Sequence, residues 1–446
     1  MRAVFCALSC LLLMPPAVLA KVAVAPNPQQ ISEYEASTES TRVKLLINLA
    51  KSGQHDLAES LLKRYPLTGE FGRNRQLYVE GLILKARGNL TGAAKKYRAA
   101  LADDPGLTLV RSELAQTLFI LQEDDSAKHH LNLLLAEAPN EYEAQGIRSF
   151  IDSIDARRPF TFGAYVSVAP STNVNNGSSI DKVYYSNGDY IAVGEQQRSG
   201  VGFNAGLNAG YSRRLGNDFS AVLAGGFNAS LYSDSDYNVF GASQSAELRY
   251  LLTGGFLGAG LVTSQNMKND ELGLGYYSYG PRVSLQKAIS ARDRINLSSV
   301  YEWRIYPDDS ESDGTALVVD GSWTHAFHSS LIGGLNAAYD RVQSGVDFNS
   351  SEAYSAGISV YKELPLGITA DLHGEVRFAD FDTIFPLYNI VREDTRWSGT
   401  VSLTKRDFNF WGYAPEIEYT YIFNDSNIAN YHYDSHSVDF RLSKDF

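Results

Sequence analysis

The sequence has very few cysteines, and both lie near its beginning. Cys6 and Cys10 are the two cysteines of the 446 residues. They fall inside a stretch typical of a secretory signal peptide, with Arg2, the apolar run "AVFCALSCLLL" and the small-residue end of Val18–Ala20. We therefore expect residues 1–20 to be a cleaved signal peptide. The exported chain then has no disulfide, no thiol catalysis and no cysteine metal site.

Long hydrophobic runs and positive charge are scarce as well. After the signal, no stretch approaches the roughly 18 apolar residues of a membrane-spanning helix, so none is predicted. Residues 157–446 carry 22 Lys and Arg against 33 Asp and Glu, a balance of −11. Because nucleic-acid binding needs a basic surface, this balance argues against a nucleic-acid partner. Tyr and Phe are abundant, with 27 and 21 copies that lie mostly in the second half.

Residues 41–156 show helical periodicity and an internal repeat. The characteristic small, aromatic and proline positions of the middle unit and of the next unit, 34 residues later, are Gly81, Ala93, Tyr97, Ala100, Pro105, Ala127 and Pro139. Small residues let two helices pack closely, and a period near 34 residues is that of the tetratricopeptide repeat. We predict tetratricopeptide-like helical repeats in residues 21–156, with an ordinary small helical bundle as the alternative. Stacked repeats form a concave surface that holds an extended peptide or another protein.

One histidine pair lies in the second helix of the last unit. His129 and His130 occupy adjacent helical positions and therefore cannot both face one metal ion. We interpret them as surface or packing residues.

After the linker Asp155–Phe160 the period changes from helical to two. In "VGFNAGLNAGYS" (201–212), large or apolar residues alternate with small or polar ones. Fourteen such segments are predicted, near 160–170, 199–213, 218–232, 237–252, 255–266, 274–289, 292–306, 314–327, 329–341, 351–363, 366–380, 394–406, 410–423 and 435–446. Segments longer than the usual five or six residues, joined alternately by short and long connections, are typical of outer-membrane strands.

The sequence thus predicts an α + β membrane protein. Residues 157–446 are expected to form a 14-stranded antiparallel transmembrane β-barrel. In the last strand, "SVDFRLSKDF", Val438, Phe440 and Leu442 share one face. We expect this strand to close the barrel against the first, because an open edge is not tolerated in lipid. The terminal Phe446 resembles a barrel-assembly signal. An even strand number places both barrel ends, and hence the helical repeats, in the periplasm.

The other face of the strands is polar and is expected to line a lumen. Its charged members are Glu247, Arg249, Arg282, Glu302, Arg304, Asp371, His373, Glu375, Arg377, Glu416 and Glu418. These residues either solvate and cross-link the lumen or line a passage. Neither a metal site at His373 nor acid–base catalysis by Glu416 and Glu418 is supported by a further motif. We predict no enzyme and no cofactor. Fourteen strands give a lumen wide enough for small solutes but not for a folded protein.

A signal peptide, a short tetratricopeptide module and a C-terminal fourteen-stranded barrel together resemble the surface lipoprotein assembly modulator (Slam) family of the type XI secretion system. The Asn-rich stretch "STNVNNGSS" (Ser171–Ser179) is similar to the one found after the first strand in that family. The resemblance implies an outer-membrane translocon for surface lipoproteins or soluble secreted proteins. Its partners would be the client protein, outer-membrane lipid, the barrel-assembly machinery and periplasmic chaperones. The alternatives are a conduit for polysaccharide and a passive porin for small solutes, each with a protein-binding repeat domain.

Overall fold

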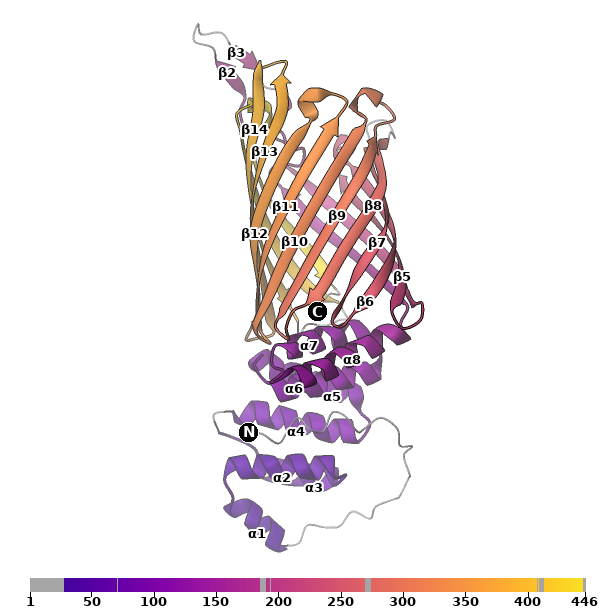
Figure 1. The fold of residues 1–446 in the computed structure, drawn as a ribbon. Helices are drawn as coiled ribbons and strands as arrows, with labels where there is room; N and C mark the ends of the chain where they lie inside the picture. Colours follow the sequence, from indigo (N-terminus) through magenta and orange to yellow (C-terminus); the bar gives the residue numbers. More distant parts are fainter. Residues whose placement is uncertain are drawn as a thin grey trace.

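The computed structural model describes residues 28–69, 71–184, 190–192, 194–268, 274–406, 408 and 413–443. Helices fill the first part of this chain and long strands the second (Figure 1). The signal peptide expected at residues 1–20 and the expected assembly signal Phe446 lie outside the described residues.

The described helices stack as antiparallel pairs. Their bounds are α1 (Pro28–Ala36), α2 (Glu39–Lys51), α3 (His55–Arg64), α4 (Gly72–Ala86), α5 (Leu90–Asp103), α6 (Thr108–Leu121), α7 (Asp124–Leu135) and α8 (Glu141–Arg157). Gly81 of α4 faces Tyr97 of α5 so closely that a Cβ on Gly81 would lie 2.3 Å from the Tyr97 Cε1 atom. The small residue therefore sets the close approach of this pair. Gly88, at a φ of +79°, makes the turn between the two helices in a conformation that favours glycine.

One hydrophobic core runs through these helices. Leu46, Val79, Tyr97, Leu114 and Leu118 are all fully buried and come from α2, α4, α5 and α6. Apolar residues that recur every three or four positions form one face of each helix. This face packs against the neighbouring unit, as in a repeat stack. No described helix has the length and apolar character needed to cross a membrane.

The strands close into a barrel of fourteen antiparallel strands, which confirms the predicted fold class. Their bounds are β1 (Phe160–Ser171), β4 (Gly200–Arg214), β5 (Phe219–Tyr232), β6 (Val239–Leu252), β7 (Gly255–Lys268), β8 (Leu274–Ala288), β9 (Asp293–Ile305), β10 (Gly314–His328), β11 (Leu331–Ser344), β12 (Ser351–Leu364), β13 (Ile368–Phe385), β14 (Ile390–Lys405), β15 (Ala414–Ser426) and β16 (Tyr433–Ser443). A separate hairpin of β2 (Lys182–Tyr184) and β3 (Tyr190–Ala192) projects from the connection between β1 and β4.

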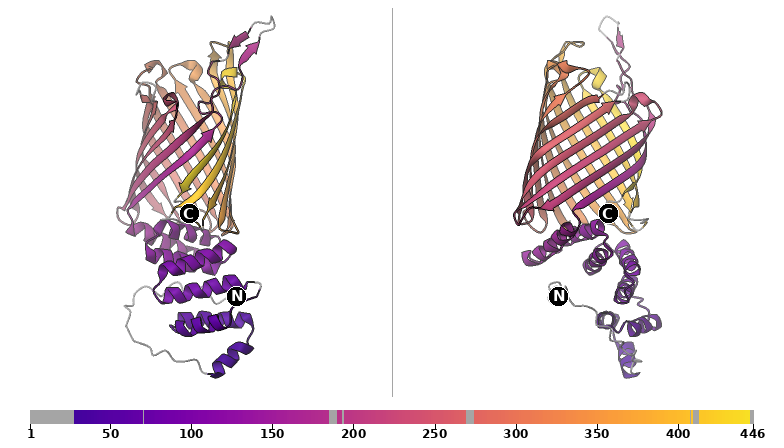
Figure 2. Two further views of the ribbon diagram at one scale, coloured as in Figure 1. Left: turned by 180° about the vertical axis from the view of Figure 1, so that it is seen from behind. Right: turned by 90° about the vertical axis from the view of Figure 1, so that its right-hand side faces the viewer.

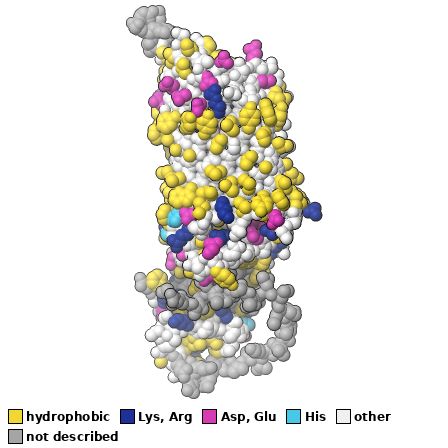
Figure 3. All heavy atoms as spheres, in the orientation of Figure 1, with side chains coloured by type: hydrophobic (Ala, Val, Ile, Leu, Met, Phe, Trp, Pro, Cys, Tyr) yellow, Lys and Arg dark blue, Asp and Glu magenta, His cyan; other side chains and the backbone are white. Residues whose placement is uncertain are grey.

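Large apolar side chains cover the outside of the barrel. Val376, Trp397 and Phe423 stand side by side on β13, β14 and β15, and Trp397 is 53% exposed. Figure 3 shows hydrophobic side chains across the middle of the visible face of the barrel, with charged side chains gathered near both rims. A band of this kind matches the apolar surface that faces lipid in outer-membrane barrels.

The two ends of the barrel differ. At the end next to the helices, the turns between strands are short, for example 253–254 and 365–367 (Figure 2). At the far end, the connections are mostly longer and include short 3₁₀ helices such as Ser235–Tyr237 and Asp347–Asn349. We refer to these as the helical end and the loop end.

One connection at the loop end is shorter than the sequence suggests. The segment 381–393 was expected to be a loop, but β13 runs to Phe385 and β14 starts at Ile390. Phe385 pairs with Ile390 and Ile384 with Val391, so bulky side chains continue the hairpin after a shift in register. Because this shift breaks the alternation of apolar and polar residues, the ends of β13 and β14 cannot be recognised from a period of two in the sequence.

Candidate functional site

The inside of the barrel is the first part of the candidate site. The structure places the eleven charged residues expected in the lumen on strand faces opposite the exposed apolar ones. Most of these side chains are bonded to one another or to neighbours. Glu247 accepts a hydrogen bond from Arg249 Nε at 2.7 Å, and Glu302 accepts one from Arg304 Nε at 2.8 Å.

A second network lies on the wall around β15 and β16. Arg441 donates to Glu418 at 2.6 Å, with its Nε 3.7 Å from Glu416. Ser402 donates to Glu416 at 2.9 Å, and Asp439 also lies 3.7 Å from the Arg441 guanidinium. Arg441 therefore gathers three carboxylates on one wall, and the sequence did not single it out.

Four further predicted lumen residues lie on β13, and two of them form looser contacts. Arg377 donates to Asp340 at 3.2 Å, and Glu375 accepts a hydrogen bond from Asn336 at 3.2 Å. Asp371 and His373 lie on the same face of β13, directly across from Ser402 and Thr400 of β14. Within the described residues, no cluster of three or more His, Cys, Asp or Glu is placed to hold a metal ion.

The wall formed by β4 and β5 is lined by small residues. In β4 the inward positions include Gly202, Gly206 and Gly210, and β5 contributes Gly226. A cavity of about 800 Å³ lies against this wall, and Arg282 and Glu302 reach it from β8 and β9. The small side chains of β4 and β5 leave free space beside this wall.

The helices lie across the helical end of the barrel, where they form the second part of the site. Figure 1 shows α7 and α8 directly beneath the strand ends. Several barrel turns bond to α8 or to the residues just after α7: Arg292 Nε donates to the Ala136 carbonyl at 3.0 Å, and Ser329 N donates to Glu137 at 2.7 Å. Arg148 of α8 also donates to the Ser290 carbonyl at 3.2 Å. The helical part is thus packed against the mouth.

A buried ionic cluster joins the two parts most tightly. Arg111 of α6 and Glu363 of β12 are both fully buried and are 2.5 Å apart. Arg406, just after β14, donates to the same carboxylate at 2.5 Å. Arg111 also donates to the Pro105 carbonyl at 2.6 Å. The Glu363 carboxylate thus balances the charge of two guanidinium groups from separate parts of the chain. Removing any one of the three groups leaves a buried charge without its partner.

The two histidines interpreted as surface or packing residues belong to this cluster. His129 Nε2 is 3.3 Å from the Tyr361 hydroxyl of β12, and His130 Nδ1 is 3.3 Å from Arg111 Nη1. Burial, reinforced by His129 and Arg111, holds the pKa of His130 well below its ordinary value. His130 is therefore neutral at the junction.

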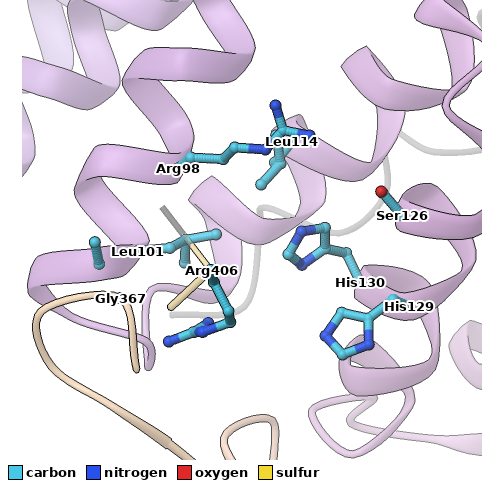
Figure 4. A pocket seen from close by; sticks show the side chains of 9 residues that line it. Arg98, Leu101, Leu114, Ser126, His129, His130, Gly367 and Arg406 are labelled. Atoms are coloured by element: carbon cyan, nitrogen blue, oxygen red, sulfur yellow. The ribbon is translucent and has the colours of Figure 1, made fainter. Parts of the chain in front are cut away.

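A small cavity of about 30 Å³ lies beside these groups. Figure 4 shows His129, His130 and Arg406 around it, with Gly367 at the edge of the barrel turn. The Gly367 N–H donates to the Ala102 carbonyl of α5 at 3.3 Å. The volume suits about one water molecule, so this cavity is part of the junction and not a binding pocket.

The Asn-rich stretch is the third part of the site, at the loop end. Asn173 is buried, and its amide donates to the Gly177 carbonyl at 2.9 Å and the Asp434 carbonyl at 3.0 Å. Ser178 Oγ donates to the Ala429 carbonyl at 2.6 Å. This segment therefore fastens the first long connection to the end of β15 and the start of β16.

The fold defines the class of the protein: an outer-membrane β-barrel whose N-terminal helical repeats lie against one end. The family model of the surface lipoprotein assembly modifier matches residues 160–446. The chain belongs to this family. Its barrel lies in the outer membrane of a Gram-negative bacterium, with the helical end toward the periplasm.

Individual relatives match over most of their length. The chain is 20% identical over 388 residues to "Surface lipoprotein assembly modifier 1" of Haemophilus influenzae, which covers 83% of this chain and 77% of that protein. It is 23% identical over 466 aligned positions to "Hemophilin secretion modulator" of Acinetobacter baumannii, covering 94% and 88%. The similarity to the second relative therefore includes the helical part.

Proposed function

We propose that this protein is an outer-membrane translocon that moves specific client proteins from the periplasm to the cell surface. The family membership supports a role in secretion. The observation that carries the proposal is the packing of the helical repeats across the periplasmic mouth, through Arg111, Glu363 and the turns near Ser290 and Ser329. A polypeptide that enters the lumen from the periplasm must then pass the helical part.

The helical part, proposed as residues 21–156, has a surface suited to recruit such a client. Several of its large apolar side chains are exposed: Leu45, Phe71, Leu109, Ile120 and Tyr142. Exposed apolar side chains on stacked helices are contact points for an extended polypeptide. The printed names of the relatives, a lipoprotein modifier and a hemophilin secretion modulator, agree with a protein client of either kind.

The barrel, proposed as residues 157–446, is then the path across the membrane. Its charged lumen residues, from Glu247 to Glu418, keep that path wet, and a lumen of fourteen strands is too narrow for a folded domain. The client therefore crosses in an extended state. We propose no catalytic step and no cofactor for this process.

The test compares surface and secreted proteomes of a deletion strain with those of the complemented strain. We expect one or a few proteins to disappear from outside and to accumulate in the periplasm. A complementing gene that lacks residues 21–156 should insert a barrel but fail to restore them. Unchanged proteomes contradict the proposal and favour a conduit for polysaccharide or small solutes, which conductance and polysaccharide release then distinguish.

A further inference from the structure

A large cavity lies between the helical repeats and the barrel, at the helical end. Its volume is about 710 Å³, within the roughly 300–1,000 Å³ typical of ligand sites. Asn132 of α7 and Ile151 of α8 line one side, and the ends of β4 to β9 with the turn 253–254 line the other. Figure 1 shows α8 beneath this part of the rim. The cavity is separate from the junction, because neither Arg111 nor Glu363 lines it.

The strands turn their inner face toward this cavity. Leu248 is exposed on the outside of β6, so Arg249, the next residue, points inward. In the same way, Arg294 precedes Ile295 on β9, and Ile295 pairs with Trp323, which is exposed on the outer face. Both arginines line the cavity. A ligand held there therefore lies at the entrance of the lumen and not against lipid.

The lining of the cavity is positively charged, although the protein as a whole is negatively charged. Six Lys and Arg line it against two Asp, whereas the barrel part of the chain has a balance of −11. Both aspartates are already engaged: Asp155 is 2.5 Å from Lys128, and Asp152 is 3.9 Å from Arg214. The cationic groups of the lining are therefore in excess over its carboxylates.

One cation of the lining stands without a counter-ion. Arg148 pairs with Glu141, and Arg249 donates to Glu247 at 2.7 Å. Arg294 is half-buried, and its guanidinium has no hydrogen bond or ion pair within the part of the chain that the structure describes. The charge that acts on it is the like charge of Arg148, from the opposite side of the cavity. Two cations that repel each other at one cavity favour the binding of an anion there.

We propose that this cavity captures an acidic, extended segment of the client polypeptide at the entrance of the lumen, and that Arg294 binds a carboxylate of that segment. This inference rests on the proposed function and names the chemistry of the segment that enters. A guanidinium suits a carboxylate because its planar N–H groups donate two parallel hydrogen bonds. Leu135, Ile151 and Phe256 also line the cavity, so the suited segment carries Asp or Glu next to apolar residues.

Peptide binding to the purified full-length protein in detergent tests the cavity. The probe is a fluorescent octapeptide of alternating Glu and Ala, and the comparison peptide has Gln in place of Glu. Fluorescence anisotropy should show binding of the acidic peptide and much weaker binding of the neutral one. Arg294→Gln should weaken binding of the acidic peptide by about tenfold or more, because a hydrogen bond to a charged group contributes that much. Arg294→Lys keeps the charge and should lose less. Equal binding of the two peptides contradicts the inference.

The matched control is Arg396→Gln on β14. Arg396 precedes the outward-facing Trp397, so it also points into the lumen, and no bond of its guanidinium is found among the described residues. It does not line the cavity. This variant should bind the acidic peptide as the unmodified protein does, and heat-resistant migration on gels checks that each variant forms its barrel. Equal weakening in both variants would assign binding to the total charge and overturn the inference.

Two other anions distinguish a site for a polypeptide from a general anion site. Inorganic phosphate and detergent-dispersed phosphatidylglycerol should each displace the acidic peptide only at concentrations far above that of the peptide itself. Displacement by either one at an equal concentration overturns the inference, because the cavity would then recognise a free anion or a lipid headgroup.

The surface level of the client separates this inference from the proposed function. In the complemented deletion strain, Arg294→Gln should lower severalfold the surface level of the protein that the deletion strain loses, and Arg396→Gln should leave it unchanged. If Arg294→Gln restores the full level while the deletion strain shows the loss, the inference is wrong and the proposed function stands. If the deletion strain loses nothing, both are wrong.

Discussion

Arg111 and Glu363 come from α6 and β12, 252 residues apart in sequence, and form an ion pair with both side chains fully buried. Arg406 shares the same carboxylate. The cluster links the helical repeats to the barrel mouth, so the orientation of one part relative to the other depends on three charged groups. Removing one member of such a group leaves an uncompensated buried charge.

Glu363→Ala should therefore loosen the junction strongly. Loss of the carboxylate leaves Arg111 and Arg406 buried without a counter-ion, which costs about 3–5 kcal/mol in comparable cases. The barrel itself should stay closed, because its strands pair independently of this group. We expect faster cleavage near Arg157–Phe160 by a soluble protease, with the heat-resistant migration of the barrel retained on gels.

The matched control uses the other end of the same strand. Glu352 of β12 is half-buried near the loop end, and the Tyr354 hydroxyl donates to it. Glu352→Ala should leave the cleavage rate near that of the unmodified protein. Similar protection in the Glu363 variant would show that the ion cluster does not hold the two parts together.

The close helix packing at Gly81 makes a second prediction. Gly81→Ala places a Cβ against the ring of Tyr97, and overpacking of this kind costs about 1–3 kcal/mol. Gly146→Ala in α8 is the control, because a Cβ there meets no heavy atom within 4 Å. That change should stabilise the helix by up to about 1 kcal/mol. Urea unfolding of the full chain, followed by the helical circular dichroism signal, measures both.

The period of the sequence predicted a good part of this architecture. Repeats such as Gly81 to Pro105 and the alternation in 201–212 are local patterns, and local periodicity determines helices, strands and their number. The junction was not predictable in this way. Glu363 fits the alternation of its strand as an ordinary lumen residue, and Arg111 fits its helix as an ordinary polar residue. Only the packing of the repeats against the barrel brings them together.

The candidate site, like the fold, was predictable from the sequence only where it depends on local periodicity. The charged lumen face follows from strand alternation, but the pairing of Arg441 with Glu416 and Glu418 depends on the register between β15 and β16. His129 and His130 were interpreted from helical geometry alone. The contact of His129 with Tyr361 of β12 is one that no helical pattern reveals. The one available signal was two adjacent histidines in a helix that is otherwise rich in leucine.

The neutral state of His130 predicts a pH effect on the junction. Its pKa is lowered well below 6.5 by burial first, with Arg111, His129 and Arg98 acting in the same direction and Glu363 opposing them. Below about pH 6.5 the unfolded chain takes up a proton that the folded chain refuses, so the unfolding free energy falls as pH falls. The stability that depends on neutral His130 is fully present above about pH 6.5 and is lost as the pH falls toward the lowered pKa.

The measurement compares urea midpoints of the helical signal at about pH 7.5 and pH 5.5. The unmodified protein should lose more stability on acidification than His130→Gln, which removes the titrating group. His55→Gln in α3 lies far from the junction and should keep the full pH dependence. An equal loss in the His130 variant would assign the pH effect to other groups.

The fastening of the first long connection makes the last prediction. Asn173 donates two hydrogen bonds and accepts one from the Gly177 N–H, and its side chain is buried. Asn173→Ala leaves these backbone groups without their partner, at a cost of about 1–3 kcal/mol for such groups. Because each 1.4 kcal/mol is about tenfold in a local opening equilibrium, cleavage within residues 171–198 by added protease should speed up by about tenfold or more.

The same variant also tests whether the bonds of Asn173 help to hold β1 and β16 together at the loop end. If the bonds of Asn173 hold the outer end of β1 to β16, the same variant should raise amide hydrogen exchange in residues 167–171 and leave residues 351–364 of β12 unchanged. Exchange that rises only inside the connection would mean that β1 and β16 stay together without it.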